Sequence, residues 1–260
     1  TRSAALAYSI NPPEPDLFAS CDHLPAPRDS EAGGPLGAAG RDGMATRDLT
    51  IAVVGSGGDG VVTLGDLVAL VAAQEGLHVI KTEAYGPQIR GGESSCTVRV
   101  SAQEIFSQGA AVDVLLVFGW AKYARFRGEI SVAPDAFVLF EAAEQHPTAE
   151  DLGIPGGERL RWFPVPFAEI ARSASGSPAT KNIVALGLLG ELLGFPAEML
   201  TKGVARRFGR KKASVLEANT RAIDAGRQFA GVQEEALRSR RLEYTPSPPR
   251  LLLSGNEAAA

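Results

Sequence analysis

The stretch IAVVGSGGDGVVTLG, Ile51–Gly65, decides the fold of this chain. Its first four residues are apolar and rich in β-formers, which is typical of a strand buried on both faces of a parallel sheet. Glycines follow closely, and from Val61 onward apolar side chains recur at helical spacing, as at Leu67 and Val71. The stretch therefore predicts a strand, a glycine turn and a helix.

The glycine turn allows two interpretations. Its glycines are Gly55, Gly57, Gly58 and Gly60, and three of them fit the dinucleotide-binding pattern G-x-G-x-x-G. Glycines and a helix N-terminus let an anion or another backbone approach closely. A ribose-binding acid should follow about 20 residues on, and Glu83, although a little late, could serve. However, Asp59 places a negative charge inside a phosphate cradle, which favours the other interpretation, a tight turn that packs the helix on the sheet.

The bulk composition is that of an ordinary globular protein. Of the 260 residues, 45% are hydrophobic and 22% charged, and the net charge of −4 argues against electrostatic binding of nucleic acid. No apolar run is long enough to span a membrane and no signal peptide is visible, so we expect a cytoplasmic protein. The two cysteines, Cys21 and Cys96, are too few for a disulfide framework, a four-thiolate zinc site or an iron–sulfur cluster. We expect Cys96 to be a buried core thiol and the chain to bind no metal.

The pattern divides the chain into three parts. Residues 1–47 are rich in Pro, Gly and Ala without periodicity, and we expect an extension that is disordered or draped over a partner. Residues 48–232 alternate strands with helical segments, and after Pro178 the pattern is helical throughout. This predicts a three-layer α/β/α sandwich with a mostly parallel, Rossmann-like sheet, followed by a C-terminal helical portion. Residues 233–260 read as a linker and the opening of a further domain.

Individual elements follow from apolar runs and turn residues. The expected strands after the first are His78–Thr82, Ser95–Ser101, Asp113–Phe118, Phe137–Glu141 and Arg161–Pro166. The expected helices beyond the first are Ala121–Phe126, Ala179–Leu193, Pro196–Phe208 and Ala213–Ala230. Near the end, Ser254 is placed to cap a short helix with Glu257 in its first turn.

Three stretches together resemble one protein family. GSGGDGVVTLGDLVA, YGPQIRGGESSCTVRVS and AVDVLLVF, in this order and spacing, resemble the gamma subunit or domain of 2-oxoacid:ferredoxin oxidoreductases. The resemblance continues through KNIVALGLLGELLG and LEANTRAIDAG and covers about residues 49–230. The terminal SGNEAAA resembles the start of the alpha domain, which follows gamma in the fused large subunit of the 2-oxoglutarate-type enzymes. One departure is Asp59, where the family commonly has Gln.

The resemblance implies chemistry for an assembled enzyme. In the family, a 2-oxoacid is decarboxylated on thiamine diphosphate with Mg²⁺, electrons leave through [4Fe–4S] clusters to ferredoxin, and coenzyme A (CoA) takes the acyl group. The partners implied are the alpha and beta domains or subunits, and ferredoxin through the complex. This chain alone has no expected catalytic residue and no cofactor of its own. The alternative function is a free-standing nucleotide-binding Rossmann-like module.

The resemblance also marks binding residues. Besides the turn glycines, they are Tyr85, Arg90, Gly91 and Gly92 of the loop YGPQIRGGES. Arg90 could receive a phosphate or carboxylate at the CoA entrance, or it could pair with an acid at the interface with the alpha domain. A basic run, Lys202–Lys212, could bind the phosphates of CoA or an acidic partner, and a solvated helix end is the simpler interpretation.

Overall fold

The computed structural model describes residues 7–10, 46–87, 91–145, 147–150, 152–154, 159–209, 211–232, 237 and 240–258. Its centre is an eight-stranded sheet with the order β7-β6-β5-β2-β4-β3-β1-β8. The strands are β1 (Ala7–Ile10), β2 (Asp48–Ser56), β3 (His78–Tyr85), β4 (Glu93–Ser101), β5 (Val112–Val117), β6 (Val132–Glu141), β7 (Arg161–Val165) and β8 (Leu251–Ser254). The helices are α1 (Val61–Gln74), α2 (Trp120–Phe126), α3 (Phe167–Ser175), α4 (Lys181–Leu192), α5 (Ala197–Phe208), α6 (Ala213–Val232) and α8 (Gly255–Ala258).

Most strands of the sheet share one direction. Strands β2, β5, β6 and β7 pair in parallel, whereas β4 is antiparallel to both β2 and β3, and β1 is antiparallel to both β3 and β8. Six of the eight strands therefore point the same way, and the predicted mostly parallel α/β architecture is confirmed. The strand expected at Ser95–Ser101 is confirmed as part of β4, which is antiparallel to both of its neighbours and lies inside the sheet.

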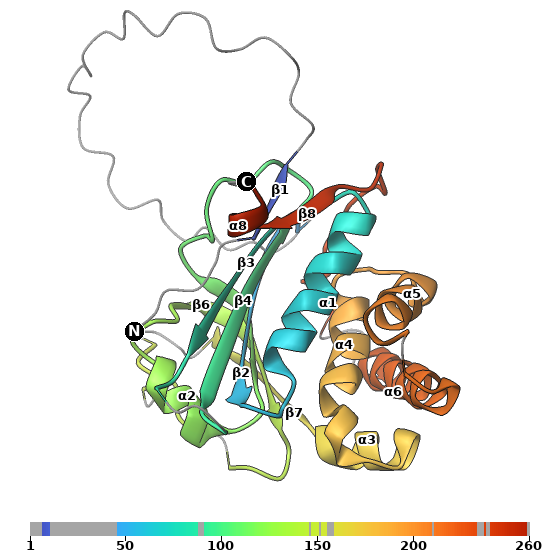
Figure 1. The fold of residues 1–260 in the computed structure, drawn as a ribbon. Helices are drawn as coiled ribbons and strands as arrows, with labels where there is room; N and C mark the ends of the chain where they lie inside the picture. Colours follow the sequence, from blue (N-terminus) through green and yellow to red (C-terminus); the bar gives the residue numbers. More distant parts are fainter. Residues whose placement is uncertain are drawn as a thin grey trace, which may run out of the picture.

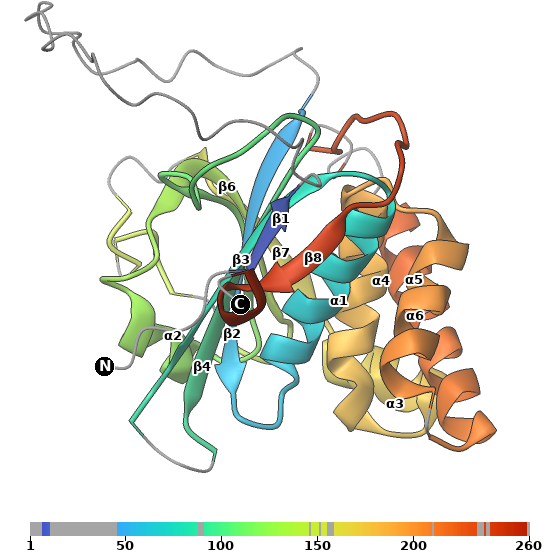
Figure 2. The ribbon, with the colours of Figure 1, turned by 45° about the horizontal axis from the view of Figure 1, so that its top comes forward.

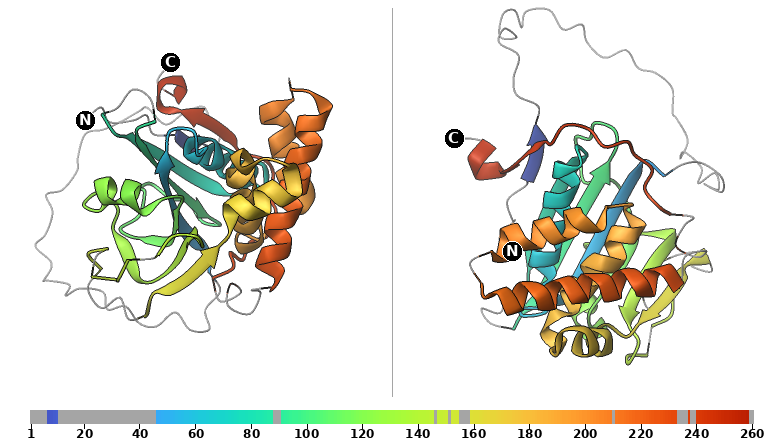
Figure 3. Two further views of the ribbon diagram at one scale, coloured as in Figure 1. Left: turned by 90° about the horizontal axis from the view of Figure 1, so that it is seen from below. Right: turned by 90° about the vertical axis from the view of Figure 1, so that its right-hand side faces the viewer.

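Helices cover the two faces of the sheet unequally (Figures 1 and 3). On one face α1 lies against β3 and β4, α4 and α5 lie against α1, and α6 packs across α4. On the other face the short α2 covers a smaller core built around Val138, Phe126 and Tyr123. Strand β2 is buried on both faces, as its uninterrupted apolar run predicts, because Ile51 and Val53 belong to the larger core while Ala52 and Val54 belong to the smaller one.

Two short elements were not expected. Within residues 1–47, where we expected an extension, Ala7–Ile10 forms β1, and the other residues up to 45 lie outside the described residues, Cys21 among them. Helix α3 was missed because only Phe167 and Ala171 of its nine residues are buried, so its apolar pattern is short.

The C-terminal segment packs on the same domain. Tyr244 donates a hydrogen bond to Glu75, and the Arg250 N–H bonds the carbonyl oxygen of Ala73 near the end of α1. Strand β8 then joins the sheet through β1, beside α1 (Figure 2). Ser254 caps α8 as predicted, since its backbone N–H donates to the Glu257 carboxylate and its hydroxyl accepts from the Glu257 N–H.

Helices α4 and α6 cross with their backbones in contact. A Cβ added at Gly187 would overlap the carbonyl oxygen of Ile223, and one at Gly226 would overlap that of Val184. Glycine is therefore required at both positions for this approach.

Candidate functional site

The glycine turn and the loop between β3 and β4 meet at the carboxyl end of β2. The N–H of Gly57 donates a hydrogen bond of 2.7 Å to the carbonyl oxygen of Gly92. A Cβ at Gly57 would lie 3.4 Å from the nitrogen of Gly91. We call residues 56–60 together with Gly91 and Gly92 the glycine junction. It brings together the two stretches in which the sequence places binding residues.

Glycine is needed at each of the other turn positions for a different reason. A Cβ at Gly55 would lie 2.9 Å from Oδ2 of Asp59, and one at Gly60 would overlap the Asn182 side chain. Gly58 and Gly60 also have φ values of 109° and 75°, which L side chains rarely adopt. An added Cβ at Gly55 or at Gly60 would therefore meet other side chains of the domain and not open space, which indicates that packing shapes the turn.

Asp59 stabilises the turn. Its Oδ2 accepts a hydrogen bond of 2.6 Å from the Ser56 N–H, and its Oδ1 lies 2.9 Å from the Lys181 ammonium. The same ammonium lies 5.0 Å from the centre of the Phe118 ring. Asp59 thus links the turn to the start of α4, and its charge is partnered within the domain.

The loop that follows β3 is described in part. Tyr85, half exposed, donates its hydroxyl to Glu83, and burial together with this carboxylate raises the pKa of Tyr85 to about 12. The phenol is therefore a donor at neutral pH and not a general base. Arg90, predicted as a binding residue, lies outside the described residues.

Beside the first half of α1 lies a group of partnered charges, Lys81, Asp66, Glu83 and Tyr85, which we call the Lys81 cluster. The Lys81 ammonium contacts both the Asp66 and Glu83 carboxylates. Burial alone would raise the pKa of Glu83, but the hydrogen bonds from Lys81 and Tyr85 outweigh it and hold this pKa below its usual range.

Cys96 next to this cluster is an inert thiol. It has no exposed surface, and a Cβ at Gly65 of α1 would overlap its sulfur. Burial raises the pKa of Cys96 to about 12, so the reactive thiolate is absent at neutral pH. The expected buried core thiol is confirmed.

Arg99 and two acids near the ends of the strands have partners within the domain. Arg99 forms an ion pair with Asp48 on the neighbouring strand. Glu141 accepts the Ala168 N–H at the start of α3, and Glu93 lies 3.6 Å from the Lys122 ammonium.

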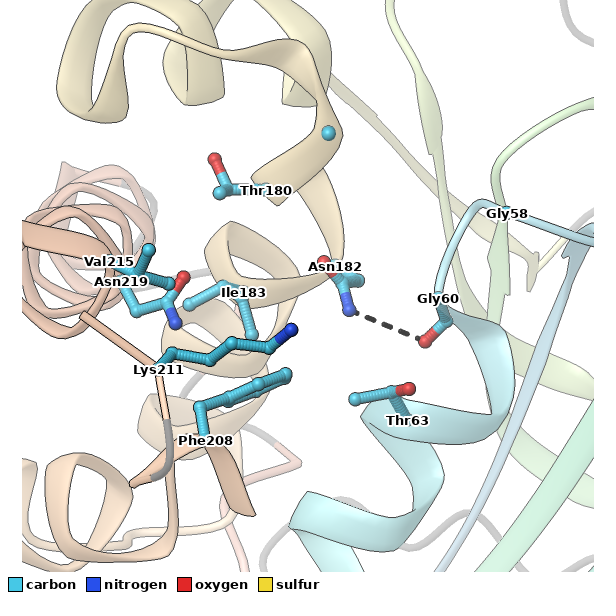
Figure 4. Close-up of a pocket in the computed structure, with 11 residues that line it drawn as sticks. Gly58, Gly60, Thr63, Thr180, Asn182, Ile183, Phe208, Lys211, Val215 and Asn219 are labelled. Atoms are coloured by element: carbon cyan, nitrogen blue, oxygen red, sulfur yellow. Dashed lines mark hydrogen bonds between the residues drawn. The ribbon is translucent and has the colours of Figure 1, made fainter. Parts of the chain in front are cut away.

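A pocket of about 270 Å³ opens between α1, α4 and α6, beside the glycine junction (Figure 4). We call it the interhelical pocket. Gly58, Gly60 and Thr63 line it at the start of α1, and Phe208, Lys211 and Asn219 line it on the other side. None of its lining residues is acidic. Its polar residues Lys211 and Asn182 were part of quoted sequence stretches, but nothing in the sequence predicts that they share a pocket.

A scan against family models matches residues 50–229 to pyruvate ferredoxin/flavodoxin oxidoreductase. The chain belongs to this family. The family expected from the three motif stretches is thereby confirmed. Among curated relatives, a ketoisovalerate oxidoreductase subunit VorA of Methanothermobacter marburgensis is 31% identical over 187 residues, covering 71% of this chain and 37% of the relative. A 2-oxoglutarate synthase subunit KorC of Archaeoglobus fulgidus is 29% identical over 183 residues, covering 70% of this chain and 90% of the relative.

Solved structures resemble the fold as well. A 2-oxoglutarate:ferredoxin oxidoreductase from Magnetococcus marinus, with 2-oxoglutarate, coenzyme A and succinyl-CoA bound, aligns with a TM-score of 0.64 and 28% identity. That alignment covers 78% of this chain and 34% of that one, so the chain spans about a third of that protein, as it does of VorA. A keto/oxoacid ferredoxin oxidoreductase gamma subunit from Geobacter sulfurreducens aligns with a TM-score of 0.52 at 24% identity over 71% of this chain and 99% of the subunit, which shows the shared fold.

Two kinds of feature are absent from the described part of the chain. No helix there has the length and apolar character needed to cross a membrane. Nor do its His, Cys, Asp and Glu residues include a group of three or more placed to hold a metal ion.

Proposed function

We propose that this chain is the gamma-domain component of a 2-oxoacid:ferredoxin oxidoreductase, with 2-oxoglutarate as the favoured substrate. The enzyme would convert a 2-oxoacid, CoA and two oxidised ferredoxins into acyl-CoA, CO₂, two reduced ferredoxins and a proton. The observation that carries the proposal is the glycine junction, in which two family motif stretches meet through the Gly57–Gly92 hydrogen bond. The Magnetococcus relative, which has CoA and succinyl-CoA bound, supports the same assignment.

Within that enzyme the chain serves assembly and forms part of the entrance for CoA. Thiamine diphosphate with Mg²⁺ supplies the electron sink for decarboxylation, and [4Fe–4S] clusters supply the path to ferredoxin. The described residues do not fit a cluster, because Cys96 is their one cysteine and is fully buried. We therefore assign these groups to the alpha and beta partners.

The substrate is tested with the purified enzyme that contains this chain. We expect CoA-dependent reduction of ferredoxin, with kcat/KM for 2-oxoglutarate about tenfold or more above those for pyruvate and 2-oxoisovalerate. Equal or better turnover of another acid would overturn the preference for 2-oxoglutarate, since relatives are also named for ketoisovalerate and indolepyruvate. No reduction with any 2-oxoacid, or micromolar binding of NAD, NADP or ATP by this chain, would overturn the assignment in favour of a nucleotide-binding module.

The role of Arg90 is tested by Arg90→Ala in the same enzyme. If its guanidinium meets CoA, the KM for CoA rises about tenfold while kcat and subunit association stay the same. If it pairs with an acid of the alpha domain, association weakens and the KM for CoA does not change. Arg125→Ala is the matched control, because Arg125 lies on α2 and pairs with Glu129 of the same surface.

A further inference from the structure

The ammonium of Lys181, the first residue of α4, has two partners from other parts of the chain. It lies 2.9 Å from Oδ1 of Asp59 in the glycine turn and 5.0 Å from the centre of the Phe118 ring, directly after β5. The lysine and aspartate side chains are only 20% and 21% exposed, so water screens this pair less than an ion pair on the open surface. Removing the lysine therefore leaves a mostly buried carboxylate without its counter-charge.

The surroundings of Lys181 hold it in a fixed place. Phe118 is 5% exposed and packs edge-on against Phe167, with the ring centres 5.4 Å apart. Shortly before the lysine, the Ser177 hydroxyl accepts the Ala179 N–H at 3.2 Å, which caps the turn that leads into α4. The lysine is therefore a rigid support, and Asp59 is the group that it supports.

Asp59 connects this support to the backbone of the glycine turn. Its Oδ2 accepts the Ser56 N–H at 2.6 Å, and its own N–H donates to the Ser56 carbonyl oxygen at 3.0 Å. Gly57, the next residue after Ser56, makes the 2.7 Å hydrogen bond to Gly92 that joins the turn to the motif loop. A carboxylate that loses its cation is drawn toward water, and this movement would carry the turn with it.

We propose that Lys181 is a positioning residue for the glycine junction and acts through the carboxylate of Asp59. The ion pair fixes the turn from the side of α4, while the Gly57–Gly92 hydrogen bond fixes it from the side of β4. The need for a cation comes from Asp59 itself, since the related family commonly has the neutral Gln at this position. The inference rests on the proposed function only where CoA serves as a readout.

Hydrogen–deuterium exchange of the purified enzyme without CoA, measured by mass spectrometry, tests the order of the turn. We expect Lys181→Met to speed exchange in the peptide covering residues 55–60 about tenfold or more. Lys181→Arg should stay within about threefold of the unmodified enzyme, because a guanidinium can pair with Asp59 and lie over the Phe118 ring. Unchanged exchange in Lys181→Met would overturn the proposal.

A double variant shows whether the lysine acts through Asp59. Asp59→Asn with Lys181→Met removes both charges but keeps an oxygen that accepts the Ser56 N–H, so exchange should return to within about threefold of the unmodified enzyme. Arg125→Met is the matched control, since it breaks a surface ion pair with Glu129 on α2 and should leave exchange in the turn unchanged. Equal acceleration in the control and in Lys181→Met would contradict a specific role.

The KM for CoA of the same variants supplies a second readout. We expect Lys181→Met to raise it about tenfold at unchanged kcat, and the double variant to recover it to within about threefold. A double variant as impaired as Lys181→Met would overturn the proposal, because the lysine would then act by itself. Exchange is measured without turnover, so a failure to oxidise 2-oxoacids would count against the proposed function alone.

Discussion

The Lys81 cluster and the interhelical pocket are two polar regions beside the first half of α1, and they differ in how their polar groups are partnered. In the cluster, Lys81 contacts two carboxylates, and Tyr85 donates to one of them. In the pocket, the exposed Lys211 and the buried Asn219 make no side-chain hydrogen bond or ion pair within the described residues. Polar groups that partner one another, as in the cluster, stabilise the fold. Donors without a partner in the domain, as in the pocket, remain available to bind a ligand. Changes in the two regions should therefore have opposite consequences for stability and for binding.

The largest expected effect comes from breaking the helix crossing that forms one wall of the pocket. In Gly226→Ala, the new methyl group overlaps the Val184 carbonyl oxygen, so α4 and α6 must separate. We expect the free energy of unfolding to fall by about 3 kcal/mol, measured by urea denaturation. The control is Gly231→Ala on the same helix, where nothing lies within 4 Å of the added Cβ and stability should not fall. Equal losses in both variants would contradict a tight crossing.

Replacing Lys81 in the cluster and Lys211 in the pocket should change stability by different amounts. Lys81→Met leaves the partly buried Glu83 carboxylate without a cation and leaves Asp66 with Arg207 alone, 3.8 Å away, and we expect a loss of about 2 kcal/mol in the free energy of unfolding. Lys211→Met removes no ion pair within the described residues and should change it by less than about 0.5 kcal/mol. If the two variants lose similar stability, the distinction between the cluster and the pocket fails.

A loss of similar size is expected where the pocket meets the glycine turn. Gly60→Ala must adopt a positive φ of 75° and displace the Asn182 side chain, and together these should cost about 2 kcal/mol. The control Gly176→Ala also has a positive φ, 81°, but nothing lies within 4 Å of its Cβ, so it should lose about 1 kcal/mol. Thermal melts of both variants measure the difference between their stability losses. A difference of zero would show that displacing the Asn182 side chain costs no free energy.

The smallest effect is a pH dependence in the Lys81 cluster. Glu83 has a folded-state pKa below its unfolded value, so its contribution is present above about pH 4.3 and is lost as the pH falls through the folded-state pKa. Glu83→Gln should therefore be less stable than the unmodified protein by about 1 kcal/mol at pH 7, and the gap should narrow steadily as the pH falls below the unfolded-state pKa of about 4.3. Urea denaturation over a series of pH values from 7 downward measures this. A gap that stays constant over the whole series would contradict an ionic origin.

Strands and long helices could be predicted because their residues carry the signal locally. Ile51–Val54 is apolar throughout since both of its faces are buried, and α6 has a helical pattern over its whole length. Strand β1 has no such signal, because its place in the sheet depends on pairing with β3 and β8, distant in sequence.

The site could be predicted only in part, for a similar reason. The glycine turn and the loop at Gly91 and Gly92 were recognised as motif stretches. They meet because β4, which begins directly after the loop, pairs antiparallel with β2, which ends at the turn. The pocket was not foreseen, because Asn182 and Asn219 lie on different helices and share a cavity only through the crossing of α4 and α6. A buried asparagine also looks the same in sequence whether or not it is partnered.

We propose that this chain takes part in binding CoA in a 2-oxoacid:ferredoxin oxidoreductase. Hydrogen–deuterium exchange of the purified enzyme, measured by mass spectrometry with and without saturating CoA, tests it most directly. We predict slower exchange in peptides covering the glycine junction, residues 56–63 and 86–93, while peptides of α3 stay unchanged. Protection confined to partner subunits, with every peptide of this chain unaffected by CoA, would contradict the claim.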